Sequence, residues 1–117
     1  MGLTYPYVKE TMPHSFSQGL SFQLGVDQMP AMITKLREEE RIDLVVVVCH
    51  MGLPLDVKLA SLINGIDVIL SGHSHDRITK PILENGCIII QSGASSSFLG
   101  RLDLTVEGVI SQTLNIN

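Results

Sequence analysis

A run of six apolar residues, Leu44 to Cys49, constrains the fold of this 117-residue chain more than any other feature. It contains four consecutive valines, and β-branched side chains favour extended backbone. A strand without polar alternation has to be covered on both faces, which is typical of a central strand in a mostly parallel sheet. The run therefore predicts an α/β fold built around this strand.

Segments on both sides of this run predict helices and a second strand. Apolar residues recur at helical spacing from Asp27, and the charged stretch Glu38 to Arg41 ends that helix. A second helix is expected over Leu55 to Asn64, where Gly65 is a stop signal. Asp67 to Ser71 indicates another short buried strand. Strand, helix and strand at this spacing form a βαβ unit, so the two strands are expected to be parallel neighbours.

The rest of the chain predicts antiparallel hairpins and a long loop. The first hairpin joins residues 78–83 to 87–91 through an Asn-Gly pair, the strongest short hairpin signal. The second joins residues 98–106 to 109–117 through Glu107-Gly108. Residues 1–25 lack a stable period and predict a short extended piece followed by a long loop.

Charge and hydropathy exclude some partners. The formal net charge is −4 and no run of Lys or Arg occurs, so a nucleic-acid polymer is not an expected partner. The longest apolar run is far too short to cross a bilayer, so no membrane span is expected. Cys49 and Cys87 lie in apolar strands and are expected to be free buried thiols, which favours a reducing, cytoplasmic compartment over an oxidising one.

Three histidines follow the two strands of the βαβ unit. His50 directly follows the first strand, while His73 and His75 follow the second, after Gly72. The carboxyl ends of parallel strands meet at one edge of a sheet, where binding sites form. Neutral imidazole is the commonest ligand for Zn²⁺ and suits other first-row metals, and a glycine lets the backbone approach closely. The sequence therefore predicts a metal site made by His50, His73 and His75.

Other polar residues near these strands have weaker assignments. Asp56 and Asp76 are candidates for orienting an imidazole from outside the ligand set, although capping of the second helix is the favoured role for Asp56. Cys49 is expected to point to the opposite side of its strand from His50, which argues against a thiolate ligand. His14 is expected to lie in a surface loop.

Three readings of the histidines remain open from the residues alone. They form part of a two-metal site, or a mononuclear three-histidine hydrolase with water in the fourth position, or a non-catalytic module with structural metal or packing histidines. A serine nucleophile is disfavoured because no Gly-x-Ser-x-Gly elbow surrounds any of Ser71, Ser74 and Ser95.

The two strand-and-histidine segments also resemble a known family. Val45 to Gly52 and Gly65 to Asp76, with Gly-His-x-His at the end, resemble the second half of a calcineurin-like metallophosphoesterase domain. The likeness is greatest to the 5'-nucleotidase / 2',3'-cyclic nucleotide phosphodiesterase branch. Gly2 to Pro6 is similar to a middle strand of that branch, and Gln91 to Leu104 is similar to the strand pair that follows Gly-His-x-His there.

The resemblance implies an α/β sandwich and a hydrolase of nucleotide phosphate esters with two divalent metal ions (Zn, Mn or Fe). By position, His50 and His73 correspond to ligands of one ion and His75 to a ligand of the other. Such an ion pair activates a water and clamps the phosphoryl oxygens.

The chain also departs from the family pattern. The Asp-x-His, bridging Asp and Asn-His-Glu or Asn-His-Asp segments of the family's front half do not occur in this sequence. We therefore expect residues 1–117 to form a single partial domain that is weakly active or inactive alone. A partial sheet leaves an edge uncovered, so self-association is expected.

Overall fold

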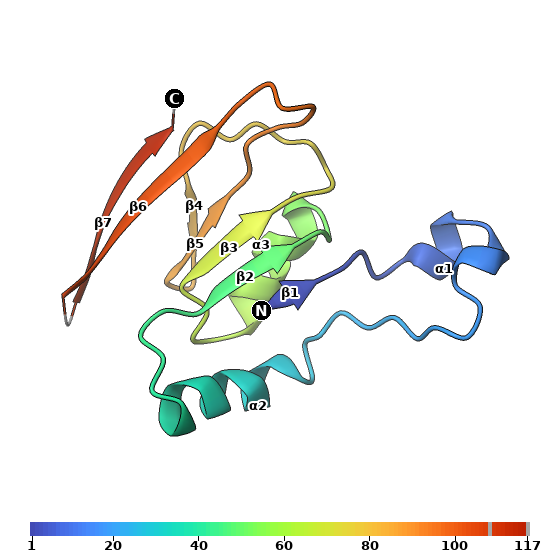
Figure 1. Cartoon of the computed structure of the whole chain (residues 1–117), viewed down its shortest axis with the longest axis horizontal. Helices are drawn as coiled ribbons and strands as arrows, with labels where there is room; N and C mark the ends of the chain where they lie inside the picture. Colours follow the sequence, from blue (N-terminus) through green and yellow to red (C-terminus); the bar gives the residue numbers. More distant parts are fainter. Residues whose placement is uncertain (108, 117) are drawn as a thin grey trace.

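The computed structural model describes residues 1–107 and 109–116. Figure 1 shows a sheet with helices beside it and a long hairpin at one flank. The elements are, in chain order, β1 (Gly2–Leu3), α1 (Val8–Thr11), the 3₁₀ turn η1 (His14–Phe16), α2 (Met29–Thr34), the π-helical turn η2 (Lys35–Glu39), β2 (Val46–Cys49), α3 (Leu53–Leu62), β3 (Val68–Ser71), β4 (Ile82–Glu84), β5 (Cys87–Ile90), β6 (Gly100–Glu107) and β7 (Val109–Ile116).

The predicted α/β fold and its βαβ unit are confirmed. β2 and β3 are joined by α3 and pair in parallel, with Val47 opposite Ile69 and Cys49 opposite Ser71. β1 extends the sheet in parallel on the other side of β2, through Leu3 and Cys49. The five-stranded sheet has the order β1-β2-β3-β5-β4.

The first predicted hairpin is confirmed, but its position in the sheet was not foreseen. β4 and β5 pair antiparallel around Asn85 and Gly86, whose φ angles of 50° and 78° are the positive values that a tight hairpin turn requires. β5 also pairs in parallel with β3, with Ile69 opposite Ile89. The prediction of an antiparallel hairpin is therefore confirmed, and β5 in addition continues the parallel part of the sheet, a pairing that the sequence did not indicate.

The helices begin at slightly different residues from those expected. α2 begins at Met29 with Pro30 in its first turn, and η2 continues it to Glu39. α3 begins at Leu53, earlier than expected, because Gly52 turns the chain with a φ of 96° directly before it. Proline in the first helical turn loses no hydrogen bond, so Pro54 fits there.

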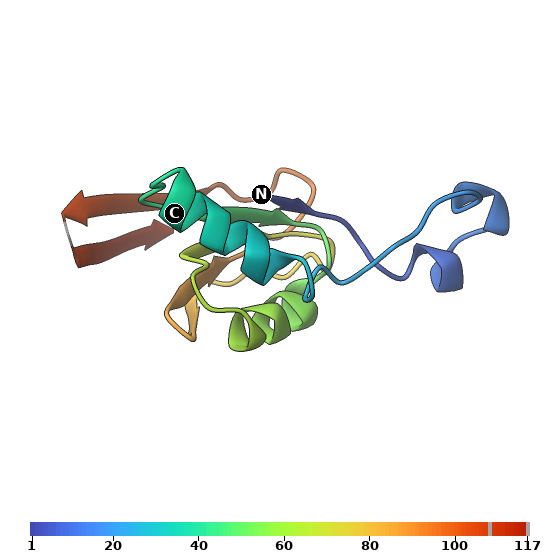
Figure 2. The ribbon, with the colours of Figure 1, turned by 90° about the horizontal axis from the view of Figure 1, so that it is seen from below.

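The main core joins the helices to the sheet. Met29 and Ile33 of α2 and Leu59 and Ala60 of α3 belong to one buried cluster with the side chains on one face of the strands. Figure 2 shows α3 below the strands in a separate layer. Both views show α1 and η1 on an arm that projects away from the sheet (Figures 1 and 2).

The second hairpin covers part of the opposite sheet face. β6 and β7 pair antiparallel, while the predicted turn residue Gly108 and the terminal Asn117 lie outside the described residues. Leu102 and Leu104 of β6 pack on a smaller cluster made by Val68, Ile88 and Ile90.

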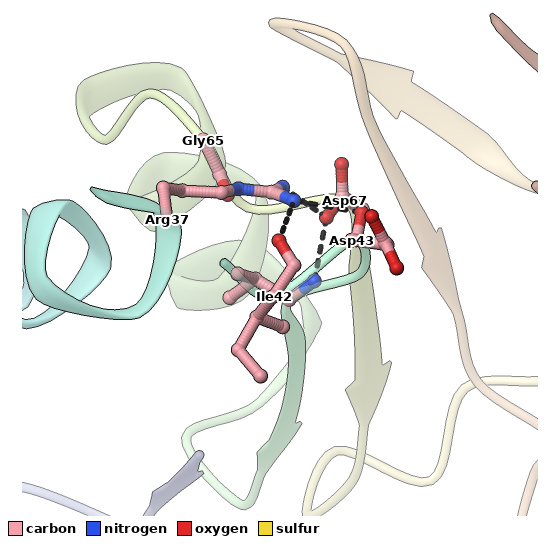
Figure 3. Close-up of polar contacts among 6 residues, drawn as sticks. Arg37, Ile42, Asp43, Gly65 and Asp67 are labelled. Carbon is pink, nitrogen blue, oxygen red and sulfur yellow. Dashed lines mark hydrogen bonds and ion pairs between the residues drawn. The ribbon is translucent and has the colours of Figure 1, made fainter. Parts of the chain in front are cut away.

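Arg37 fixes the chain entering β2 and β3 (Figure 3). Its guanidinium forms an ion pair with the Asp67 carboxylate, which also accepts a hydrogen bond of 2.6 Å from the Val45 amide. The same guanidinium donates to three backbone carbonyls, those of Ile42 (3.0 Å), Asp43 (2.7 Å) and Gly65 (3.2 Å). η2 thus holds together the loops from which the two central strands begin.

Within residues 1–107 and 109–116, no helix has both the length and the apolar character to span a membrane.

Candidate metal centre

His50 and His73 meet at the carboxyl ends of β2 and β3. Their ring centroids lie 5.0 Å apart, with 66° between the ring planes, and both side chains are exposed. Gly72 makes this approach possible. A Cβ atom at Gly72 would lie 3.3 Å from His50 Nδ1 and 3.3 Å from the Cys49 carbonyl oxygen. The strand ends therefore bring together two of the three predicted ligands.

His73 is also stacked on an aromatic ring from a third strand end. The Tyr5 ring, just after β1, lies 4.3 Å from the His73 ring, with 31° between the planes. Tyr5 was not singled out from the sequence, because its position at the site depends on β1 pairing with β2. Three neighbouring parallel strands therefore each contribute a ring to the same edge.

His75 is not grouped with the other two histidines. Among the described residues, no set of three or more His, Cys, Asp and Glu side chains lies close enough together to hold a metal ion. His75 is exposed and has a φ of 61°, and His73 has a φ of 79°. Positive φ is costly for residues other than glycine and is found where surrounding structure enforces it, often at functional sites. The assignment of all three histidines as ligands stays a prediction.

Asp76 contributes hydrogen bonds through its backbone. Its amide donates to the Gln91 side chain and its carbonyl accepts from the Gly93 amide at 2.9 Å. Its role in supporting an imidazole stays a prediction. The sequence placed Gln91 only at the start of a segment similar to a strand pair of the family, and it indicated no role for the glutamine side chain.

Asp56 is a buried carboxylate under the site. It lies in the first turn of α3 with 0% of its surface exposed, and no side-chain cap hydrogen bond is made at this helix end. The favoured capping role was therefore wrong. Neither carboxylate oxygen has a hydrogen-bond partner among the described residues. The side chain is instead enclosed between α3 and the ends of the two central strands.

Burial dominates the proton affinities around Asp56. Desolvation raises the pKa of the Asp56 carboxyl, and the Cys49 thiol, the Ser71 hydroxyl and the His50 imidazole oppose that rise. Burial, with Asp56 beside it, also raises the pKa of the Cys49 thiol to about 12. Cys49 is thus a buried free thiol, as predicted, and not a thiolate donor.

A cavity of about 470 Å³ opens beside the two histidines. It lies between the strand ends and the arm, and its lining residues are Tyr5, Val8, Thr11, Met12, His50 and His73. Its size falls in the range of small-molecule sites, and its walls combine apolar side chains with two imidazoles.

The donor set fits a transition metal in part. Two exposed imidazoles 5.0 Å apart are the ligand type that Zn²⁺ and related ions prefer. A tetrahedral ion needs four ligands, so His50 and His73 are half of one coordination shell.

Known proteins resemble this chain both in sequence and in fold. No family model matches the chain. The chain is 31% identical to part of the trifunctional nucleotide phosphoesterase YfkN of Bacillus subtilis, over 64% of this chain and 5% of that protein. It is 26% identical to the 5'-nucleotidase of Vibrio vulnificus, over 88% of this chain and 24% of that protein.

A solved structure matches nearly the whole chain. The sulfate thiohydrolase SoxB of Thermus thermophilus superposes with a TM-score of 0.87 at 36% identity, over 99% of this chain and 22% of that protein. The chain thus spans less than a quarter of the length of each of these relatives. By its Gly-His-x-His segment, its sheet and these relatives, it belongs to the calcineurin-like metallophosphoesterase superfamily, in the 5'-nucleotidase branch, and corresponds to the C-terminal part of that domain.

Proposed function

We propose that this chain supplies part of the metal site of a phosphoesterase that hydrolyses nucleotide phosphate esters. The observation that carries the proposal is the His50–His73 pair, which two adjacent parallel strands place 5.0 Å apart at a cavity of about 470 Å³. Relatives named nucleotide phosphoesterase and 5'-nucleotidase support this substrate class.

In this proposal His50 and His73 hold one divalent ion (Zn, Mn or Fe), and His75 is a ligand of a second. Bound ions of this kind supply Lewis acidity and an activated water. The remaining ligands come from polypeptide outside these 117 residues, so the chain alone is weakly active or inactive. A mononuclear site of all three histidines has less support, because the described residues do not gather His75 with the other two.

The chain's own residues have separate tasks around this pair. The Tyr5 ring covers one face of His73 and restricts its rotation. Val8 and Met12 form an apolar wall of the cavity beside the imidazoles, against which the alcohol portion of the ester packs. His50 and His73 bind metal only as neutral imidazoles, so acid weakens the site.

The proposal is tested by nucleotide binding. Calorimetry with a nucleoside monophosphate is carried out with and without Mn²⁺ on the wild-type chain, on His73→Ala and on His14→Ala, whose exposed side chain lies on the arm in η1. Binding is expected only with Mn²⁺, and is expected to be lost in His73→Ala and kept in His14→Ala. Nucleotide binding that persists in His73→Ala would contradict the proposal. Lower stability of the histidine variants without lost turnover would favour a structural role for the histidines.

Self-association is also proposed. Val48 and Leu70 lie opposite each other in β2 and β3 and are 58% and 37% exposed. β1 forms a free edge of the sheet beside them. A second copy of the chain would cover this apolar area. Sedimentation velocity is expected to show a dimer that Val48→Lys disrupts, and a wild-type monomer at all concentrations would refute this.

A further inference from the structure

Gln91 lies at the centre of the two histidine loops. It directly follows β5, the strand beside β3, and is only 3% exposed. A buried amide has to satisfy two donors and two acceptor positions, so its partners define its role. Nearly all of the hydrogen bonds of this amide go to the segment that carries His73 and His75.

The amide contacts that segment before, between and after the two histidines. Its Nε2 donates to Ser71 Oγ at 2.7 Å and to the Gly72 carbonyl at 3.2 Å. It lies 3.3 Å from Ser74 Oγ, between the histidines. Its Oε1 accepts a hydrogen bond from the Asp76 amide, directly after His75. One side chain thus holds both ends of the loop.

Ser74 links this loop to the one that carries His50. Its Oγ accepts a hydrogen bond of 2.9 Å from the amide of Leu53, the first residue of α3. The two loops are in contact at this point, because a Cβ atom on Gly52 would lie at van der Waals distance from the next loop, 3.6 Å from His73 Cδ2 and 3.7 Å from Ser74 Cβ. Gln91 is therefore connected through Ser74 to the turn between His50 and α3.

We propose that Gln91 is a positioning residue that sets the separation and orientation of the His50 and His73 imidazoles for metal binding. This inference rests on the proposed function and deepens it. His73 and His75 have φ angles of 79° and 61°, which a loop keeps only when its surroundings hold it there. The hydrogen bonds of Gln91 hold the loop there, together with those donated by the amides of Leu53 and Gly93.

The chemistry of the amide explains why glutamine suits this position. The Gly72 carbonyl needs a donor, while the Asp76 amide needs an acceptor. An ionised glutamate offers acceptors only and would face the Gly72 carbonyl with negative charge. Leucine has a similar volume but satisfies neither group, so the loop is expected to relax and carry the His73 ring away from His50.

The test uses Gln91→Leu and Gln91→Glu in the full chain, with Ile90→Val as the matched control. Ile90 precedes Gln91 in β5 but belongs to the cluster on the opposite sheet face. Co²⁺ is titrated by calorimetry and its ligand-field absorption is recorded. Both Gln91 variants are expected to lose about 10- to 100-fold in Co²⁺ affinity, with a changed spectrum, as for other residues that orient metal ligands. Ile90→Val is expected to bind Co²⁺ as the wild type does, whatever its melting temperature.

A metal-free measurement separates this inference from the proposed function. The His73 ring lies against Tyr5, so its proton resonances are expected to be shifted in the wild type and in Ile90→Val, and to move to ordinary values in Gln91→Leu. Unchanged Co²⁺ binding and unchanged His73 resonances in both Gln91 variants would overturn the inference and leave the proposed function standing. A wild type that binds no Co²⁺ would refute the proposed function, and the His73 resonances would then decide the inference alone.

Discussion

Cys49 and Ser71 lie opposite each other in parallel strands, and the histidine after each of them reaches the same site. The register of β2 and β3 therefore sets the height of His50 and His73 relative to one another. The single glycine between Ser71 and His73 supplies the remaining adjustment, because it leaves room for the His50 ring. A metal site at this edge thus depends on backbone geometry as much as on the imidazoles.

Substitution of Gly72 tests that dependence. A Cβ atom there would lie 3.3 Å from His50 Nδ1, tighter than an ordinary contact, so Gly72→Ala is expected to push the His50 ring aside. We expect Zn²⁺ affinity, measured by calorimetry, to fall about tenfold, the lower end for displaced ligand geometry. Gly2→Ala is the control, since a Cβ atom there meets nothing within 4 Å. Equal affinities in the two variants would show that Gly72 has no such role.

The buried Asp56 carboxylate predicts a pH-dependent stability. Burial raises the pKa of the Asp56 carboxyl in the folded chain above its ordinary value of 3.8. The stability that comes with the neutral acid is therefore complete below pH 3.8 and is lost as the pH rises through the folded pKa. Asp56→Asn has no carboxyl group at this position to ionise, so its stability does not fall in this way as the pH rises. Its melting temperature relative to wild type is therefore expected to increase from pH 4 to pH 8. The exposed Asp27→Asn serves as the control. A difference independent of pH would contradict this account of Asp56.

The Arg37 ion pair predicts a loss of fold stability distant from the site. Arg37→Met removes charge-assisted bonds to Asp67 and to three carbonyls, so the free energy of unfolding is expected to fall by about 2 kcal/mol. Lys35→Met is the matched control in the same turn, because the Lys35–Glu40 pair is 3.9 Å long and well exposed. That variant is expected to change stability by less than about 0.5 kcal/mol. Urea titrations measure both, and equal effects would contradict the role given to Arg37.

The burial of Cys49 and Cys87 predicts that their reactivity toward a disulfide reagent reports on unfolding. Burial raises the pKa of Cys49 and of Cys87 to about 12, and both are at most 3% exposed. Neither is expected to react with a disulfide reagent at pH 8 until the chain unfolds in denaturant. Rapid modification of either thiol in the native chain would show that the core opens locally near that strand.

The elements of this fold that depend on neighbouring residues could be predicted from the sequence. Four consecutive valines predict β2, and Asn85-Gly86 predicts the β4–β5 hairpin, because these signals act within a few residues. The parallel pairing of β5 with β3 depends on contacts between segments far apart in the chain, so no local pattern indicates it. The predicted start of α3 was late by two residues, because the backbone turn at Gly52 begins the helix at Leu53.

The candidate site likewise has features that local sequence patterns predict and features that depend on contacts between distant segments. His50 and His73 follow strands that the sequence predicts, so their convergence was predictable. The position of His75 depends on positive φ angles. The role of Gln91 depends on four partner residues in another strand and its loop. The capping role for Asp56 failed because local spacing does not reveal that the side chain lies between α3 and the sheet.

The central claim is that His50 and His73 bind one metal ion together, and Zn²⁺ titration of His50→Ala, His73→Ala and the double variant tests it most directly. Ligands of one ion are not independent, so each single variant is expected to lose most of the wild-type affinity and the double variant little more. Wild-type affinity retained in both single variants, or losses that simply add in the double variant, would contradict a shared ion.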